Sequence, residues 1–238
     1  MSFVEELEWD SAFFGMRIGR VRGGAVLGEL TQALAEADER GIRCLYLLAP
    51  AADLGLLDAA QEHGFRVRDV RVELARAVAG HGAAMWPGLR TGRPQDLERL
   101  EPLARSAFRG TRFFGDPGFP RERSAQLYVE WLRRGLSGAG ERVTLVGGDL
   151  SGFVVCEIDT TAREGRISLI AVAAEVSGQG LGGTLMEGAG HVFRERGLAR
   201  ASVITQGHNV AALRLYERLG YRTENVSLWL HRWRGQLG

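Results

Sequence analysis

The sequence predicts a fold of the α/β class, of the α+β type, in which helices flank a mixed and mostly antiparallel sheet. Short apolar or β-branched runs alternate with amphipathic stretches at helical spacing along the chain. Two of the apolar runs flank Gly147-Gly148-Asp149, which is typical of a hairpin. An internal repeat indicates that a smaller, degenerate half-copy precedes the main unit.

The first part of the chain predicts three strands and two helices. We expect strands near 17–22, over 44–48 and over 65–76, and helices over 29–40 and 54–63, ended by Gly41 and Gly64. The last of these strands alternates through Phe65 and Val67 and then, beyond Asp69, through Val70, Val72 and Leu74. We expect these apolar residues on the buried face of a half-buried strand.

The second part predicts two helices, a hairpin and two further strand–helix pairs. We expect helices over 96–108 and 121–136, hairpin strands over 143–146 and 152–158, a strand over 167–172 and a strand over 201–205. A glycine-rich turn opens the helix between the last two strands, and a final helix runs from Asn209 to Gly220.

The repeat has an offset of 156 residues, which places Arg196-Gly197 over Arg40-Gly41 (196 − 40 = 156). The same shift matches Leu57 with Leu213, Gly64 with Gly220, Phe65 with Tyr221 and Leu74 with Leu230. The first copy has Ala60 where the second has Tyr216, so we expect it to lack catalytic function. Chance similarity is the alternative. We predict a partial domain over 1–80, a linker within 77–88 and the main domain over 87–238.

Composition excludes several classes of function. The net charge is +1 with acids and bases interspersed, which does not favour nucleic-acid binding. The longest apolar run, 44–60, is interrupted by a proline and two aspartates, so we expect no membrane span. Cys44 and Cys156 lie in apolar runs, and the first residues lack the pattern of a signal peptide. We expect buried free thiols and a cytoplasmic protein, and the scattered histidines predict no metal site.

The stretch from Arg166 to Gly183 carries the strongest functional signal. An apolar strand is followed by a short link and then by glycines at 178, 180, 182 and 183, which open an amphipathic helix. Glycine-rich backbone at a helix N-terminus favours a phosphate or pyrophosphate. A dinucleotide fingerprint is one alternative, but five residues separate strand and glycines, and too little chain follows for a doubly wound sheet. A turn without a ligand is the other alternative.

A second cluster, Gln206 to Tyr221, places polar residues on one helix. Asn209 stands at the predicted N-cap, and Tyr216 lies seven residues on, two turns along the same face. Each residue alone is typical of an ordinary cap or of core packing.

Together, the glycine stretch and Asn209-x-x-Ala212-x-x-x-Tyr216 resemble the GNAT superfamily of CoA-dependent N-acyltransferases. The resemblance implies the GNAT fold, acetyl-CoA as acyl donor and Tyr216 as the proton donor to the CoA thiolate. It implies cofactor contacts at Ile170, Ala171, Val172, Ser177, Gly178, Gln179, Gly180, Leu181, Gly182, Gly183, Asn209 and Ala212. Ser177 departs from the family pattern, which has Arg or Gln at that position.

Further motifs resemble the GNAT members that acetylate the amino group of a dTDP-linked amino sugar. They are the segments 7–15, 106–114 with 128–132, and 227–233. The resemblance implies a small-molecule amine as acceptor, and a homodimer is compatible with it. The acceptor-pocket candidates are Trp9, Phe13, Phe14, Arg112, Phe113 and Tyr128.

The general base is predicted less directly. Glu157 lies on the predicted strand next to strand 167–172, which carries cofactor contacts, and His208 is expected at the rim of the site. Both are candidates for the general base, and a water molecule is the alternative. Two other functions stay open at this point. One is acylation of another small-molecule or antibiotic-pathway amine, and the other is a decayed acyl-CoA-binding module.

Overall fold

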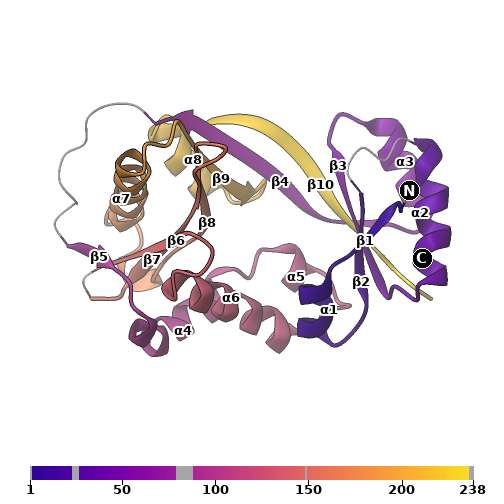
Figure 1. The fold of residues 1–238 in the computed structure, drawn as a ribbon, viewed down its shortest axis with the longest axis horizontal. Helices are drawn as coiled ribbons and strands as arrows, with labels where there is room; N and C mark the ends of the chain where they lie inside the picture. Colours follow the sequence, from indigo (N-terminus) through magenta and orange to yellow (C-terminus); the bar gives the residue numbers. More distant parts are fainter. Residues whose placement is uncertain (1, 23–26, 79–87, 148, 236–238) are drawn as a thin grey trace.

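One ten-stranded sheet runs through the protein, in the order β1-β2-β3-β10-β4-β9-β8-β7-β6-β5 (Figure 1). The computed structural model describes residues 2–22, 27–78, 88–147 and 149–235. Its strands are β1 (Val4–Glu6), β2 (Ile18–Val21), β3 (Cys44–Pro50), β4 (Arg66–Ala77), β5 (Leu89–Thr91), β6 (Arg142–Gly147), β7 (Gly152–Asp159), β8 (Glu164–Val172), β9 (Arg200–Gln206) and β10 (Arg222–Trp233). The β2–β3 and β8–β9 pairs are parallel and the other pairs are antiparallel. The predicted fold class is confirmed.

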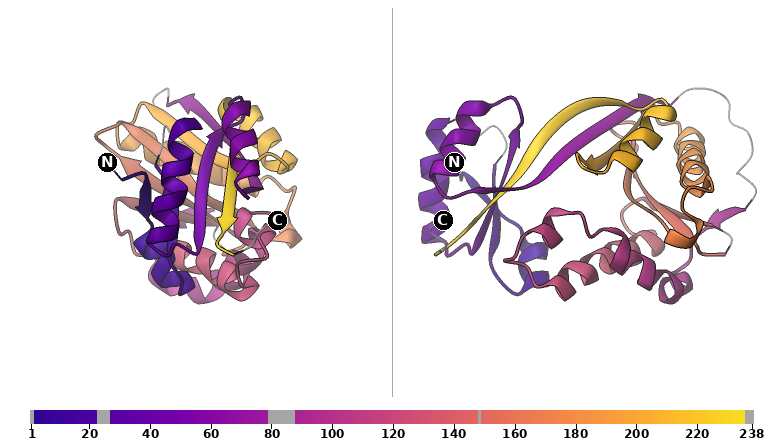
Figure 2. Two further views of the ribbon diagram at one scale, coloured as in Figure 1. Left: turned by 90° about the vertical axis from the view of Figure 1, so that its right-hand side faces the viewer. Right: turned by 180° about the vertical axis from the view of Figure 1, so that it is seen from behind.

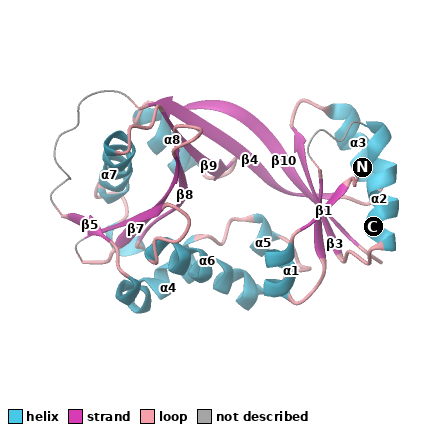
Figure 3. Ribbon diagram, in the orientation of Figure 1, coloured by secondary structure: helices cyan, strands magenta, loops and turns pink. Residues whose placement is uncertain are grey.

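Helices cover both faces of this sheet (Figures 2 and 3). They are α1 (Glu8–Phe14), α2 (Leu27–Glu39), α3 (Leu54–Glu62), α4 (Leu97–Ala107), α5 (Arg112–Gly115), α6 (Arg121–Leu136), α7 (Leu181–Glu195) and α8 (Val210–Arg218). Helices α1, α4, α5 and α6 share one apolar core. Helices α7 and α8 pack into a second core and α2 and α3 into a third, both on the opposite face. No helix in the described ranges is both long and apolar enough to cross a membrane.

Local sequence signals locate most elements closely. Helix α6 has the predicted bounds, and the hairpin of β6 and β7 forms where the glycines indicated it, although Gly148 lies outside the described residues. Asp53 and Asn209 cap their helices, since their side-chain oxygens accept from the backbone N–H of Leu56 and Ala212 at 3.0 and 3.3 Å. Cys44 and Cys156 are buried free thiols, as predicted.

The repeat is present in the structure at the predicted offset. Adding 156 to the bounds of β3, α3 and β4 gives the bounds of β9, α8 and β10 (44 + 156 = 200, 54 + 156 = 210, 66 + 156 = 222). Gly41 and Gly197, which end α2 and α7, both have a φ of 66°. Matching turns and matching elements make chance similarity untenable.

The two copies exchange their last strands. Strand β10 lies between β3 and β4, and β4 lies between β10 and β9. The registers are related by the same shift, since Ser227 pairs with Pro50 and Arg71 pairs with Gln206. Each copy therefore completes the sheet of the other, and the boundary predicted near residues 80–87 divides one continuous sheet. That boundary and the predicted linker fall largely outside the described residues.

The sheet opens where strands β8 and β9 separate. Strands β8 and β9 pair from Glu164↔Arg200 to Ile167↔Val203, and beyond these residues β8 pairs with no described strand on that edge. A β-bulge at Ser168 lies where this separation begins, and a second bulge lies at Arg68 of β4. Bulges bend a strand and redirect side chains, so the opening is built into the strands themselves.

Candidate active site

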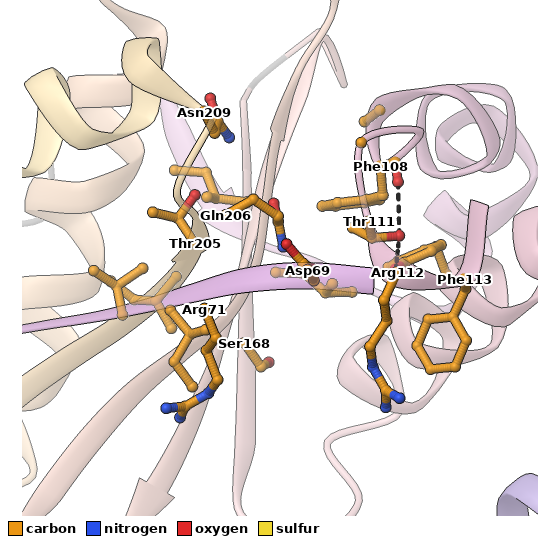
Figure 4. A pocket seen from close by; sticks show the side chains of 18 of the residues that line it. Asp69, Arg71, Phe108, Thr111, Arg112, Phe113, Ser168, Thr205, Gln206 and Asn209 are labelled. Carbon is orange, nitrogen blue, oxygen red and sulfur yellow. Dashed lines mark hydrogen bonds between the residues drawn. The ribbon is translucent and has the colours of Figure 1, made fainter. Parts of the chain in front are cut away.

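A cavity of about 600 Å³ fills the opening between β8 and β9. This volume is within the range of small-molecule sites in proteins. The residues that line it come from strands β4, β8, β9 and β10, from α6 and α8 and from the segment around α5, and Figure 4 shows several of their side chains. Its described lining includes Asp69, Arg71, Phe108, Thr111, Arg112, Phe113, Tyr128, Trp131, Arg166, Ser168, Ile170, Thr205, Gln206, His208, Asn209, Tyr216 and Trp229.

The glycine-rich loop stands at the N-terminus of α7, beside the end of β8. Gly178 and Gly180 adopt left-handed φ values of 79° and 93°, and a Cβ built on either would meet no neighbouring atom within 4 Å. The first turn of α7 carries no acidic residue, and its N-cap is Gly180, whose lack of a side chain leaves the first N–H groups uncovered. The first backbone N–H groups of a helix have no intrahelical acceptor. The loop therefore offers an open set of donors that fits a pyrophosphate.

The loop and the cavity lie along the same strand. A Cβ on Gly182 would lie 3.8 Å from the side chain of Val172, and Ile170, two residues earlier on β8, lines the cavity. The edge of β8 between them faces no strand. A long ligand bound at the loop can therefore follow this edge into the cavity. The backbone N–H and C=O groups of β8 on this edge can then pair with the extended arm of the ligand.

Helix α8 brings Tyr216 into the cavity. Tyr216 is only 3% exposed, and burial raises the pKa of its phenol well above the ordinary value. The phenol therefore keeps its proton throughout the physiological range. Asn209 and Ile170 line the same cavity as Tyr216, while Ala212, Ser177 and Gln179 do not.

Asp69 is a cavity residue that sequence reasoning passed over. Its side chain is 9% exposed, and its Oδ1 is buried without a hydrogen-bond partner among the described residues. Burial raises the pKa of the Asp69 carboxyl to about 6, against the smaller lowering effects of His208 and nearby backbone N–H groups. The sequence did contain an indication of its role, namely a carboxylate within an alternating apolar strand. Burying a charge costs free energy, so an acidic residue in such a strand is a candidate functional residue.

The bulge in β4 explains why Asp69 faces inward. Val67 pairs with Leu230 and Asp69 with Trp229, which leaves Arg68 as the extra residue. Arg68 and Asp69 consequently share the face toward α5, where Arg68 Nε lies 3.2 Å from Asp116 Oδ2. Val67 and Val70 are 44% and 37% exposed, so the prediction that they are buried was wrong.

The segment around α5 supplies the aromatic wall. Tyr128 Oη donates to Thr111 Oγ1 at 2.6 Å, and Thr111 Oγ1 donates to the carbonyl of Phe108 at 3.0 Å (Figure 4). The ring of Phe108 stacks on that of Tyr128, with centroids 4.5 Å apart. The predicted acceptor-pocket residues Arg112, Phe113 and Tyr128 thus come together in the cavity.

The aromatics of α1 lie behind this wall. Phe14 stacks on Phe113 at 5.7 Å, while Trp9 and Phe13 stack on each other. The guanidinium groups of Arg134 and Arg123 cover these last two rings. None of the three α1 aromatics is among the described residues that line the cavity, so their contribution is to pack the wall.

Glu157 lies outside the cavity. Its carboxylate pairs with Arg142, whose Nη2 is 3.0 Å from Oε1, and both line a separate depression. Arg166 lines both that depression and the cavity and so stands between them. The structure therefore brings Asp69 and His208, and not the predicted base Glu157, into the cavity that Tyr216 lines.

Comparison with known proteins gives consistent matches. The family model described as the acetyltransferase (GNAT) family matches residues 99–221. The chain is 30% identical over 233 residues to dTDP-fucosamine acetyltransferase of Escherichia coli O6:H1, covering 96% of this chain and 97% of the relative. It is 30% identical over 145 residues to the spore coat polysaccharide biosynthesis protein SpsD of Bacillus subtilis, covering 60% and 50%. A solved GCN5-related N-acetyltransferase from Sphaerobacter thermophilus superimposes with a TM-score of 0.65 at 16% identity, over 97% of this chain and 76% of that one.

Proposed function

Because this chain belongs to the GNAT family of acetyltransferases, we propose that it acetylates the amino group of a nucleotide-linked amino sugar of the dTDP-fucosamine class. One observation carries the proposal. The similarity to dTDP-fucosamine acetyltransferase spans 96% of the chain, including the first copy of the repeat, which contributes Asp69 and Arg71 to the cavity. The first copy is therefore part of the site, and not only a support for it.

Acetyl-CoA, the acyl donor of the family, supplies the acetyl group as a thioester. The first backbone N–H groups of α7, which begins at Leu181, fit its pyrophosphate, and the edge of β8 at Ile170–Val172, which pairs with no described strand, fits its extended arm. Asn209 lines the same cavity, and we expect it to contact that arm. Ser177 brings no charge to the loop, so the backbone carries the phosphate interaction here.

Tyr216 is the proposed general acid. Its phenol opens onto the cavity from α8 and remains protonated because burial raises its pKa. A phenol in this state donates its proton from Oη to the departing sulfur. His208 lines the cavity too, but its side chain stands at the exposed rim.

Asp69 is the proposed general base. Acyl transfer requires a neutral amine, so the incoming ammonium group has to lose a proton first. With a pKa of about 6, the carboxylate is ionised at neutral pH and basic enough to accept that proton at its unpartnered Oδ1. The acid and the base then come from different copies of the repeat, on α8 and β4.

Release of free CoA thiol tests the proposal, with purified enzyme, acetyl-CoA and either dTDP-linked amino sugars or simple amines. We expect turnover with the nucleotide-linked sugars and a fall in kcat of about 10²–10⁴ in Tyr216→Phe. Tyr221→Phe is the matched control, because Tyr221 is a buried tyrosine 6.1 Å from Tyr216 that is absent from the cavity lining. Turnover only with simple amines would refute the acceptor class, and equal activity of the two Phe variants would refute the role of Tyr216.

A further inference from the structure

Arg112 has an environment that packing alone does not require. Its guanidinium lies over the rings of Tyr46, Phe113 and Trp229, with the central carbon 4.2, 4.2 and 4.3 Å from the ring centroids. Three aromatic faces stabilise a cation without neutralising it. The side chain is therefore held in one place while its charge stays available.

A buried pair fixes the direction of the guanidinium. Arg112 Nη1 lies 2.8 Å from His231 Nε2, and His231 Nδ1 lies 2.6 Å from Asp116 Oδ2. Arginine can only donate, so His231 Nε2 is the acceptor and its proton sits on Nδ1, which donates to Asp116. The imidazole is neutral in this arrangement, in agreement with burial lowering the pKa of His231 to about 4.

Asp116 is fully occupied by other donors. Its carboxylate accepts from Trp233 Nε1 at 3.0 Å and from the backbone N–H of Gly118 at 2.9 Å, and Arg68 Nε lies 3.2 Å away. It therefore holds the imidazole in place, and its own charge is already paired with that of Arg68. Gly118 is required here, because a Cβ at that position would lie 2.1 Å from the ring of Trp233.

The other arginines of the cavity are differently placed. Arg71 pairs with Glu73 at 3.0 Å, and Arg166 lies 3.9 Å from Glu164. Arg112 forms no ion pair with any carboxylate of the described residues. Its guanidinium lies on the far side of Asp69 from Asn209, the residue proposed to contact the acyl donor (Figure 4). The cavity thus has a donor end, a basic carboxylate and then an unpaired cation.

We propose that Arg112 binds the phosphate groups of the acceptor, and that the His231–Asp116 pair is a positioning device for Arg112. This inference rests on the proposed function and deepens it, because it assigns recognition of the nucleotide diphosphate to one side chain. A guanidinium donates to phosphate oxygens through paired N–H groups, and with Nη1 held by His231, Nε and Nη2 remain for the ligand. The amine at the other end of the acceptor then lies toward Asp69.

The test compares two acceptors that share the amino sugar and differ in the phosphate. One is the dTDP-linked amino sugar and the other is its methyl glycoside, which carries no phosphate. In wild type we expect the first to have the higher kcat/KM, and in Arg112→Met we expect the ratio of the two values to fall by about 10- to 100-fold, the size of a lost charge-assisted contact. Arg109→Met removes the same charge from an exposed position in the same segment and should leave the ratio unchanged.

Two His231 variants separate positioning from bulk packing. His231→Gln keeps an acceptor near the Nε2 position and should retain most of the ratio. His231→Asn keeps only the donor toward Asp116 and should lose part of the ratio. The KM for acetyl-CoA should be unchanged in both His231 variants. Equal losses of ratio in the two variants, or a ratio in Arg112→Met that equals that of wild type, would overturn the proposal.

A calorimetric experiment separates failure of the Arg112 proposal from failure of the proposed acceptor class. If wild type acetylates neither sugar, the proposed function fails, and binding of dTDP then tests Arg112 alone. The titration is done with CoA at saturation, so that the glycine-rich loop is occupied, and with thymidine as the phosphate-free probe. Weaker dTDP binding in Arg112→Met with unchanged thymidine binding supports the site, and equal dTDP binding in both proteins refutes it.

Discussion

Replacing Asp69 by Asn should make the protein more stable and less active, and the size of the first effect follows from the structure. The carboxyl has an ordinary pKa of 3.8 when unfolded and about 6 when folded, because burial disfavours its charged form. A shift of about two units corresponds to about 3 kcal/mol. Asn has nearly the same shape and no charge, so it escapes this cost.

The sign of the pH dependence is fixed by the direction of the shift. Between about pH 4 and pH 6 the unfolded chain has released the Asp69 proton and the folded chain retains it, so raising the pH favours unfolding. The cost is absent below the unfolded pKa and complete above the folded one. The stability advantage of Asp69→Asn should therefore grow from nearly zero at about pH 4 to as much as about 3 kcal/mol above about pH 7.

Urea unfolding and steady-state kinetics measure the two effects. We expect kcat/KM of wild type to rise through about pH 6 and that of Asp69→Asn to lie about 10²–10⁴ lower, because its amide accepts no proton. Asp58→Asn is the control, since Asp58 is an exposed carboxylate on α3. An Asp69→Asn protein with wild-type activity, or with a stability difference that is the same at both ends of the pH range, would refute the reasoning.

Two further predictions concern the loop and the exchanged strands. Gly180→Val should weaken acetyl-CoA binding at least about tenfold by calorimetry, because a β-branched residue is strained at a φ of 93° and distorts the loop. Gly197→Val places the same residue at a left-handed φ of 66° at the other end of α7, away from the loop, and should bind acetyl-CoA normally. Leu74 and Leu230 occupy equivalent, fully buried positions on β4 and β10, so replacing either by Ala should lower the free energy of unfolding by about 2–5 kcal/mol. Unfolding followed by circular dichroism and by tryptophan fluorescence should remain one shared transition, and separate transitions would show that the two copies fold independently.

The sequence was informative wherever structure is decided within a few residues. The side chains of Asp53 and Asn209 cap the starts of α3 and α8, and Gly64 and Gly220 follow their ends with left-handed φ values, so both helices could be located from sequence. The repeat was readable for the same reason, since turn glycines and apolar positions match together. The exchange of β4 and β10 was not readable, because strand order depends on contacts between residues far apart in the chain.

The same distinction separates the site residues that were found from those that were missed. Tyr216 and Asn209 share one helix, so their spacing predicted a common site and the structure brings them to one cavity. Asp69 reaches that cavity only through the exchange and through a bulge at Arg68, and neither has a local signature. Trp9 was expected in the acceptor pocket because segment 7–15 resembles a motif of the acetyltransferases of dTDP-linked amino sugars, but in the structure Trp9 stacks on Phe13 under Arg134 and does not line the cavity.

The proposed acid and the proposed base come from different copies of the repeat. Position 60 of the first copy has Ala where the second has Tyr216, and position 225 of the second has Asn where the first has Asp69 (60 + 156 = 216, 69 + 156 = 225). The first copy thus lacks the phenol and the second lacks the carboxylate. Exchange of β4 carries Asp69 into the sheet of the second copy, where it pairs on one side with β10 and lies beside the cavity of Tyr216. Strand exchange therefore brings into one cavity the proposed acid and the proposed base, which no single copy holds, and it explains how a first copy without the phenol still lines the cavity.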